Sequence, residues 1–307
     1  MLAKTIAKMS SWWILPALFV LSYAVYVGTH ALGIERWVTL AFIGLMIVLE
    51  RVYRYRYAVS QRSLLLRDIT STAVNLFVTG AVGGLLVLPV LVFLPEHLLG
   101  RNLVFGSPEQ LGPLWLQVPI IMLFVSFFRY WMHRFQHKNE FLWKLHSYHH
   151  QVTDLQARNV LVSHPIDFGL RNVLVFFILG IIGFSPFAIV LAVPAVQVSG
   201  VFSHWGGDVK GGVLNYFFVT PEVHRWHHSA TVPEGHRYSV NYGVEYSFWD
   251  ILFGTFHLPQ TAEGPEQPVR LGHPNGYVDE PNYLKLLLVP LGLYPPHWFK
   301  RAQQPAE

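Results

Sequence analysis

Residues 114–150 read LWLQVPIIMLFVSFFRYWMHRFQHKNEFLWKLHSYHH. The first part, Leu114 to Phe128, is mostly apolar and approaches the roughly 20 residues that a helix needs to cross a bilayer. Five histidines then follow between positions 133 and 150, far more than an even spread of the chain's 16 histidines would put there. This stretch therefore predicts an embedded helix that ends at a group of histidines.

The composition of the whole chain also indicates a membrane protein. Of its 307 residues, 52% are hydrophobic and 13% are charged, whereas about a quarter of the residues in soluble domains are charged. Three further apolar runs, Trp12 to Thr29, Trp37 to Leu49 and Val74 to Leu94, each predict a spanning or deeply embedded helix. The absence of cysteine excludes disulfides and cysteine-ligated zinc or iron–sulfur sites.

Basic residues beside the apolar runs predict the topology. Lys4 and Lys8 precede the first run, which we interpret as a retained anchor because no cleavage site follows it. A cluster of arginines comes after the second run: Arg51, Arg54, Arg56, Arg62 and Arg67. Both groups are expected on the cytoplasmic side. The net charge of +4 is therefore explained by topology and lipid head groups, and no nucleic acid partner is expected.

The order of the apolar runs and of the segments rich in Pro, Gly and Asn predicts one structural unit in three parts. Residues 1–112 are expected to form anchoring helices and an external loop, residues 113–258 a catalytic region, and residues 259–307 an interfacial tail. The segment Pro95 to Pro113 predicts the loop, and the short apolar segment Tyr283 to Tyr294 closes the tail. Within the middle part, the apolar stretch Leu170 to Phe202 is broken by Gly183, Ser185 and Pro186. This break predicts a hairpin or two shallow helices, with both ends on the cytoplasmic side. The expected fold is an all-α, multi-pass membrane bundle with a cytoplasm-facing helical cap that carries the histidines.

The histidine spacing predicts a metal centre with two ions. His133 and His137 are four residues apart, which places them on one helical face. The pattern HxxHH then occurs twice, at His146, His149 and His150 and at His224, His227 and His228. Neutral imidazole binds iron, zinc, copper and nickel, and eight imidazoles exceed what one ion accepts. Isolated histidines at 30, 97, 273 and 297 are interpreted as interfacial or hydrogen-bonded and are left out of the site.

The order HxxxH, HxxHH, HxxHH resembles the fatty acid hydroxylase and sterol desaturase superfamily of integral-membrane di-iron enzymes. Flanking residues strengthen the resemblance over residues 113–258: Tyr130-Trp131, Leu142-Trp143, Thr220-Pro221, Asn241-Tyr242-Gly243, Trp249-Asp250 and Phe253-Gly254-Thr255. The short interval between the first two clusters and the NYG…WD…FGT ending look more like the hydroxylase branch than the acyl-CoA desaturases.

The resemblance implies an oxidoreductase, a di-iron monooxygenase of lipid metabolism. Two iron ions with O2 as co-substrate are expected to insert a hydroxyl into an unactivated C–H bond of a membrane lipid, which could be an acyl lipid, a sterol or a carotenoid. Desaturation on the same scaffold is the first alternative, and a non-catalytic membrane protein that binds zinc or copper is the second. A separate electron donor, a ferredoxin or a cytochrome b5-like protein, is also implied. The oligomeric state stays open.

The resemblance also extends the list of candidate site residues. It implies His204 as a ninth ligand. His164 is either a ligand, a residue that supports a ligand, or a cap at the turn made by Pro165. Asp250, Asn241 and Tyr242 are candidates to support the ligands, with the alternatives of a helix cap for Asp250 and a simple turn for the other two. The acids at 167, 208, 222 and 245 are unranked further candidates, and the aromatic residues at 127, 128, 130 and 131 are candidates to line a substrate route.

Three positions depart from the family's pattern. Ser126 and Ser239 stand where an acidic residue is usual, and Val162 stands where an arginine is usual. Because the eight cluster histidines are present, we interpret these departures as the mark of a distinct substrate branch. The expected location is a bacterial inner membrane, or the endoplasmic reticulum membrane if the source is a eukaryote. Residues 303–307 carry no obvious signal for retrieval to the endoplasmic reticulum, which favours the bacterial membrane.

Overall fold

The computed structural model describes residues 35–52, 62–82, 85, 111–262, 264–273 and 282–288. Some of the predicted features lie outside the described residues: the apolar run Trp12 to Thr29, and the histidines at 30, 97 and 297. Of the predicted external loop, Pro95 to Pro113, only the last three residues are described. Within the described part the chain is mostly helical, as expected, and the only sheet there is a two-residue pairing of β1 (Gln260–Thr261) with β2 (Gly264–Pro265).

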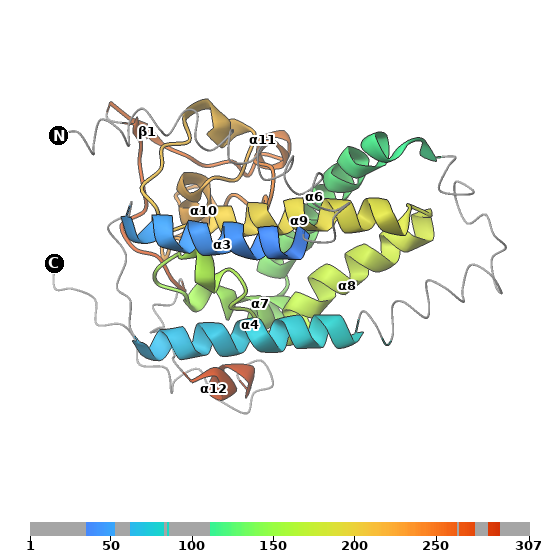
Figure 1. Cartoon of the computed structure of the whole chain (residues 1–307). Coiled ribbons are helices and arrows are strands. Elements are labelled where there is room, and N and C mark those ends of the chain that lie inside the picture. Colours follow the sequence, from blue (N-terminus) through green and yellow to red (C-terminus); the bar gives the residue numbers. More distant parts are fainter. Residues whose placement is uncertain are drawn as a thin grey trace.

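Five long helices build the body of the part that the structure describes. They are α3 (Glu35–Val52), α4 (Arg62–Val82), α6 (Leu114–Lys138), α8 (Pro165–Ile182) and α9 (Pro186–Ser203). Figure 1 shows α8 and α9 as a hairpin, with α3 lying along α9 and α4 lying along α8. The apolar core between α6, α8 and α9 includes Val118, Ile121, Val175, Leu179 and Ala188.

The break predicted inside the stretch Leu170 to Phe202 is confirmed. Gly183 ends α8 in the left-handed conformation (φ 89°), which glycine adopts without steric cost, and its N–H returns to the carbonyls of the last turn. Pro186 then opens α9 in the first turn of a helix, where its missing N–H costs nothing. The two halves therefore fold back on one another as an antiparallel pair.

Two described helices, α6 and α8, are long and apolar enough to cross a membrane. Large apolar side chains on α6 face outward, and Trp115, Ile120 and Leu123 are each 40% or more exposed. Similar side chains are exposed on α4, where Phe77 is 75% exposed. Exposed apolar surface on this scale fits an environment of lipid better than one of water. These observations support membrane association.

The structure corrects the interpretation of one arginine and the start of one helix. The run Val74 to Leu94 was expected to begin the third helix after a cytoplasmic basic flank, but α4 already begins at Arg62. Arg67, expected near lipid head groups, is buried and pairs with Asp68 at 2.6 Å. Asp68 also pairs with Arg158 of the loop after the second histidine cluster, at 3.0 Å. Arg67 therefore belongs to an ion-pair network that ties α4 to the site.

Short elements at one end of the long helices carry the rest of the site. They are α7 (Glu140–His146), η3 (His149–Gln151), η4 (Ala157–Asn159), η5 (Gly212–Tyr216), α10 (Pro221–His227) and α11 (Phe248–Leu252). A further short helix, α12 (Tyr283–Leu288), begins at the first residue of the predicted closing segment Tyr283 to Tyr294, and Tyr283 packs against Tyr148. In Figure 1, α10 lies next to one end of α9 and above α3, and α11 lies further above them.

Candidate metal centre

All nine histidines predicted as ligands converge, and they do so in two groups. The ligand atoms within each group lie within 4.8 Å of one another. The first, the five-histidine group, contains His133, His137, His146, His150 and His227. The second, the four-histidine group, contains His149, His204, His224 and His228. Every one of these side chains is buried.

Helix periodicity explains how the clusters divide between the groups. His133 and His137 lie one turn apart on α6 and share a group. In each HxxHH pattern the first and last histidines are also four residues apart, and they too share a group: His146 with His150, and His224 with His228. The middle histidine of each pattern, His149 or His227, points from a different face and joins the other group. The two groups therefore interlock.

Ring contacts show that the two groups adjoin. The rings of His150 and His228, which belong to different groups, stack with their centroids 4.4 Å apart. His227 lies 4.3 Å from His133 in its own group and 5.3 Å from His228 in the other, between ring centroids. A pair of ions held by these histidines would thus occupy neighbouring positions in one buried centre.

The tautomers of two rings argue for a cation between them. His133 directs Nδ1 at the carbonyl of Tyr242 at 2.8 Å, and His146 directs Nδ1 at the carboxylate of Asp167 at 3.2 Å. Both acceptors require N–H at Nδ1, so Nε2 carries the lone pair in each neutral ring. Those two Nε2 atoms face one another at 3.0 Å. Two lone pairs cannot hydrogen-bond, whereas both can bind one metal ion.

Unpartnered nitrogens on the other rings support the same conclusion. Nε2 of His137, His150 and His227, and both ring nitrogens of His224 and His228, are buried without a hydrogen-bond partner among the described residues. Buried polar atoms are rarely left in this state, because each unmet hydrogen bond costs free energy. The residues present therefore fit a pair of metal ions.

Burial keeps these imidazoles neutral, which is the form that binds metal. It lowers the pKa of His204 and that of His227 to about 3. It also lowers the pKa values of His149, His150, His224 and His228 well below the usual range, with neighbouring histidines as the next cause. A lone pair is accordingly available on each ring at neutral pH.

Backbone carbonyls orient three of the rings. His133 donates to Tyr242, His149 donates to Val162 at 2.9 Å, and His227 donates to Val240 at 2.8 Å. Such contacts fix the tautomer and the ring direction of a metal ligand. Sequence reasoning missed Val162 and Val240 in this role, because every residue type offers a carbonyl and no sequence signal marks it.

Two side chains orient further rings. Asp167, one of the four unranked acids, accepts from His146 and also pairs with Arg171 at 3.2 Å, Ser163 at 2.9 Å and Gln136. Asn159 faces Nδ1 of His204 through its side-chain oxygen at 3.3 Å. Asn159 was not predicted, although it follows Arg158 in the loop that Asp68 holds.

Asp250 supports the site through the backbone rather than by touching a histidine. It is fully buried, and it accepts from the N–H of Tyr242 at 2.6 Å, the N–H of Gly243 at 2.8 Å and the hydroxyl of Thr255 at 2.7 Å. These bonds hold the turn whose Tyr242 carbonyl receives His133. Burial raises the pKa of Asp250 to about 6, while the three hydrogen bonds oppose that rise.

The neighbours of Asp250 explain the NYG sequence. Asn241 has a positive φ of 55°, and its side chain bonds the backbone of Val223 and of His257. A Cβ on Gly243 would lie 2.7 Å from the Asp250 carboxylate, so a larger residue would displace that carboxylate. Asn241 and Tyr242 thus hold a turn whose carbonyl also orients His133, which combines the two interpretations left open by the sequence.

The other candidates lie away from the metal-facing nitrogens. His164 caps α8 by accepting from the N–H of Ile166 at 3.2 Å and is outside both groups, which favours the cap over the ligand. Glu222 accepts from the N–H of Gly211, and Glu245 pairs with Arg129. Burial raises the pKa of Glu245. Asp208 is half exposed.

The positions that depart from the family pattern have local partners. Ser126 accepts from the indole N–H of Trp249 at 3.0 Å, and Ser239 donates to the carbonyl of His227 at 3.0 Å. Among the candidate aromatic residues, Tyr130 is fully buried and bonds Thr255, whereas Phe127 and Trp131 are about 40% exposed beside Phe253. The aromatic candidates thus divide between core and surface.

Fold and site together define a mostly helical protein with two adjoining, histidine-only candidate metal sites. Residues 118–255 match the family model described as fatty acid hydroxylase, and this region contains all nine histidines. This region is therefore similar to the fatty acid hydroxylase and sterol desaturase superfamily, in agreement with the resemblance inferred from the sequence.

Three relatives illustrate the match. An ornithine lipid hydroxylase of Rhizobium tropici is 36% identical over 50% of this chain and 45% of its own length. A delta(7)-sterol 5(6)-desaturase of Aspergillus fumigatus is 26% identical over 59% of this chain and 62% of its own length. Sphinganine C4-monooxygenase 2 of Arabidopsis thaliana is 27% identical over 53% and 63%. The chain thus spans about half to two thirds of these relatives, and no solved structure matches it significantly.

Proposed function

We propose that this protein is an O2-dependent di-iron hydroxylase of a membrane-embedded lipid. The observation that carries the proposal is the pair of adjoining histidine groups. The Nε2 lone pairs of His133 and His146 face one another, and several other ring nitrogens in the two groups have no hydrogen-bond partner among the described residues. The names of the relatives, which include lipid hydroxylases, give the reaction class its support. The nine histidines are assigned as the ligands of two iron ions.

The irons, when bound, would supply the activation of O2 and the removal of hydrogen from an unactivated C–H bond. The chain's own residues hold the ligands in place. Asp167, Asn159 and the carbonyls of Tyr242, Val162 and Val240 fix ring tautomers, and Asp250 holds the Tyr242 turn. Burial of all nine rings limits the access of water to the centre.

The topology proposed with this function is a multi-pass membrane protein with residues 113–258 as the catalytic region and the centre on the cytoplasmic side. Two apolar helices and the outward apolar faces of α4 and α6 support it. A bacterial inner membrane is the proposed location. A separate ferredoxin or cytochrome b5-like donor would deliver electrons from the cytoplasm.

Desaturation is the second candidate function, and it is favoured by the sterol desaturases among the relatives. Both reactions begin by removing hydrogen from the same kind of bond. The experiment is expression in a lipid-producing host, with mass spectrometry of total lipids. Lipids heavier by one oxygen support hydroxylation, and lipids lighter by two hydrogens support desaturation.

Metal analysis of the purified protein separates both enzymes from metal storage. Two irons per chain and O2-dependent lipid products are expected for the native chain. Replacement of His149 and His150 by alanine removes one ligand from each group, so the product should disappear. Unchanged product in this double variant would refute the assigned centre, and zinc or copper in place of iron without any product would favour storage.

A further inference from the structure

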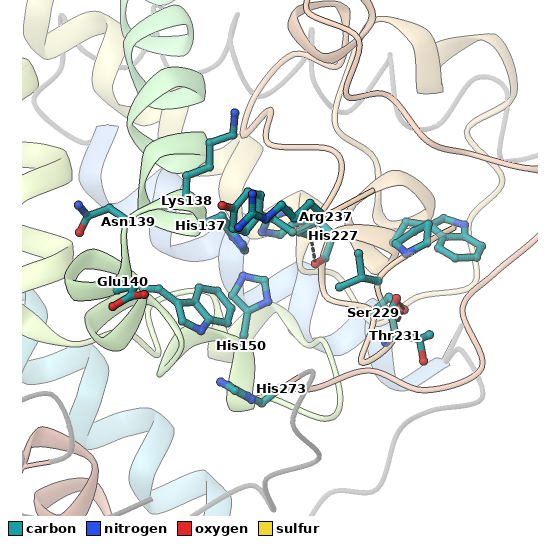
Figure 2. A pocket seen from close by; sticks show the side chains of 16 residues that line it. His137, Lys138, Asn139, Glu140, His150, His227, Ser229, Thr231, Arg237 and His273 are labelled. Atoms are coloured by element: carbon teal, nitrogen blue, oxygen red, sulfur yellow. Dashed lines mark hydrogen bonds between the residues drawn. The ribbon is translucent and has the colours of Figure 1, made fainter. Parts of the chain in front are cut away.

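A pocket opens directly beside the five-histidine group. Its volume is about 230 Å³, and His137, His150 and His227 form part of its wall. Figure 2 shows these three rings close together among the side chains that line the pocket. Pockets that enclose a whole small molecule are usually about 300–1,000 Å³. This pocket therefore has room for one end of a lipid, not for the complete molecule.

Charges of both signs line the pocket. Lys138 and Arg237 are cationic and Glu140 is anionic, and all three are exposed. Within the part of the chain that the structure describes, none of their side chains forms an ion pair, although the Arg237 guanidinium lies over the ring of Tyr238 at 5.3 Å. In Figure 2, Glu140 lies to one side of His150 and Arg237 to the other. The pocket thus offers separated sites for an anion and a cation.

The remaining wall combines hydrogen-bonding groups with two indole rings. Ser229, Thr231 and Asn139 are polar, while Trp143 and Trp226 are apolar surfaces with a polar tip. His273, which sequence reasoning had set aside as interfacial or hydrogen-bonded, is buried here against Trp143 with ring centroids 5.5 Å apart. Burial lowers the pKa of His273 to about 4, so it adds no charge at neutral pH. An occupant with a purely apolar end would leave the charged and polar wall unmatched.

We propose that this pocket binds a zwitterionic lipid head group, with its anionic group at Arg237 and its ammonium group at Glu140. This inference rests on the proposed function, because it names the substrate class of the same centre. The anionic group is either a phosphate or a carboxylate, and both accept hydrogen bonds from a guanidinium. Since the pocket ends at the five-histidine group, the carbon that is attacked lies near the polar end of the lipid.

Binding of short-chain probes tests the head-group preference without turnover. The full-length protein in a non-ionic detergent would be titrated by calorimetry with dihexanoyl phosphatidylethanolamine, Nα-octanoyl lysine, dihexanoyl phosphatidylglycerol and dihexanoylglycerol. The first two are zwitterionic, the third is only anionic and the fourth is neutral. We expect both zwitterionic probes, or one of them, to bind most tightly. Which one binds identifies a phosphate or a carboxylate as the anionic group.

Two variants and two matched controls locate the charges. Arg237→Gln and Glu140→Gln should each weaken the preferred probe about two- to fivefold, the range expected for exposed ion pairs. Arg270→Gln and Glu234→Gln change equally exposed residues outside the pocket and should leave binding unchanged. The proposal would be overturned if neutral dihexanoylglycerol bound as tightly as the zwitterionic probes. It would also be overturned if the control variants weakened binding as much as the pocket variants.

The position of the added oxygen is an independent readout. If the head group occupies the pocket, fragmentation of the hydroxylated lipid should place the oxygen in the head group or in the carbons next to it. Oxygen near the methyl end of an acyl chain would overturn the head-group site while leaving the hydroxylase intact. Conversely, a charge-dependent probe preference in a protein that makes no oxygenated lipid would count against the proposed function alone.

Discussion

Replacing Asp250 by asparagine separates the stability of the fold from the geometry of the metal centre. Asparagine keeps the shape but has one oxygen, whereas the carboxylate accepts from three donors: two backbone N–H groups and the Thr255 hydroxyl. At least one charge-assisted hydrogen bond is lost, at a cost of about 1.5–3 kcal/mol. The side-chain NH₂ group of the asparagine would also lie against one of these donors, with which it cannot form a hydrogen bond.

An opposing effect reduces the cost to stability. Burial raises the pKa of Asp250 from 3.8 to about 6, a difference that corresponds to about 3 kcal/mol against the charged form at neutral pH. Asparagine carries no charge and avoids this penalty. The two effects are similar in size, so the free energy of unfolding should change by less than about 2 kcal/mol. No such compensation exists for the carbonyl of Tyr242, which loses its fixed position against His133.

The expected result is therefore a protein that folds but binds iron poorly at the five-histidine group. Loss of a contact that orients a ligand typically lowers metal affinity about 10- to 100-fold. Iron titration followed by Mössbauer spectroscopy would measure occupancy of the two sites, with thermal unfolding of the metal-free protein as the measure of stability. Asp208→Asn, at a half-exposed acid, is the control. Full occupancy of both sites in Asp250→Asn would refute the role assigned to the turn.

Three further predictions concern acid sensitivity and two polar side chains. Seven histidines of the two groups, those outside α6, have lowered pKa values, so the folded state resists their protonation. Stability that is present above pH 6.5 is therefore lost as the pH falls. Each proton that the unfolded chain binds in excess lowers the free energy of unfolding by about 1.4 kcal/mol per pH unit. The metal-free protein should therefore unfold within about two pH units below 6.5. A circular dichroism spectrum that stays native at pH 4 would contradict this. Asn159→Leu should weaken iron binding at the four-histidine group alone, because it removes the partner of His204; loss of both irons in the same titration would argue for a general folding defect. His164→Ala should cost about 0.5–2 kcal/mol as a lost helix cap and leave iron content at two, whereas loss of an iron would make His164 a ligand after all.

The convergence of the eight cluster histidines could be predicted from the sequence, because their spacing follows the helical repeat. The pair His133 and His137 needed only a helix to share a face. The division of each HxxHH pattern between two groups depends on how α7, η3 and α10 cross, and that arrangement comes from tertiary packing. His204 came from family resemblance alone, and the end of α9 places it against His149, with ring centroids 4.9 Å apart.

The residues that sequence reasoning missed act through contacts distant in the chain. Arg67 looked like a topological marker, but its partner is the adjacent Asp68, which reaches Arg158 some 90 residues later. Glu50 of α3 accepts from the N–H of Ala157 at 2.8 Å, which fixes the short helix η4 that ends at Asn159. Spacing within a local window carries no information about such pairs. The helix boundaries near Gly183 and Pro186 were predictable because both residues act on their own backbone.

The carbonyls that orient His133, His149 and His227 also determine how the protein tolerates mutation. A hydrogen bond to a side chain disappears when that residue changes, but a backbone carbonyl persists through most substitutions at its position. Val162 and Val240 can thus vary in side chain while the acceptors for His149 and His227 remain. The orientation of these imidazole rings therefore depends on the path of the backbone and not on the side chains at positions 162 and 240. Because both valines are buried, substitution there changes the packing but leaves the acceptor for the imidazole in place.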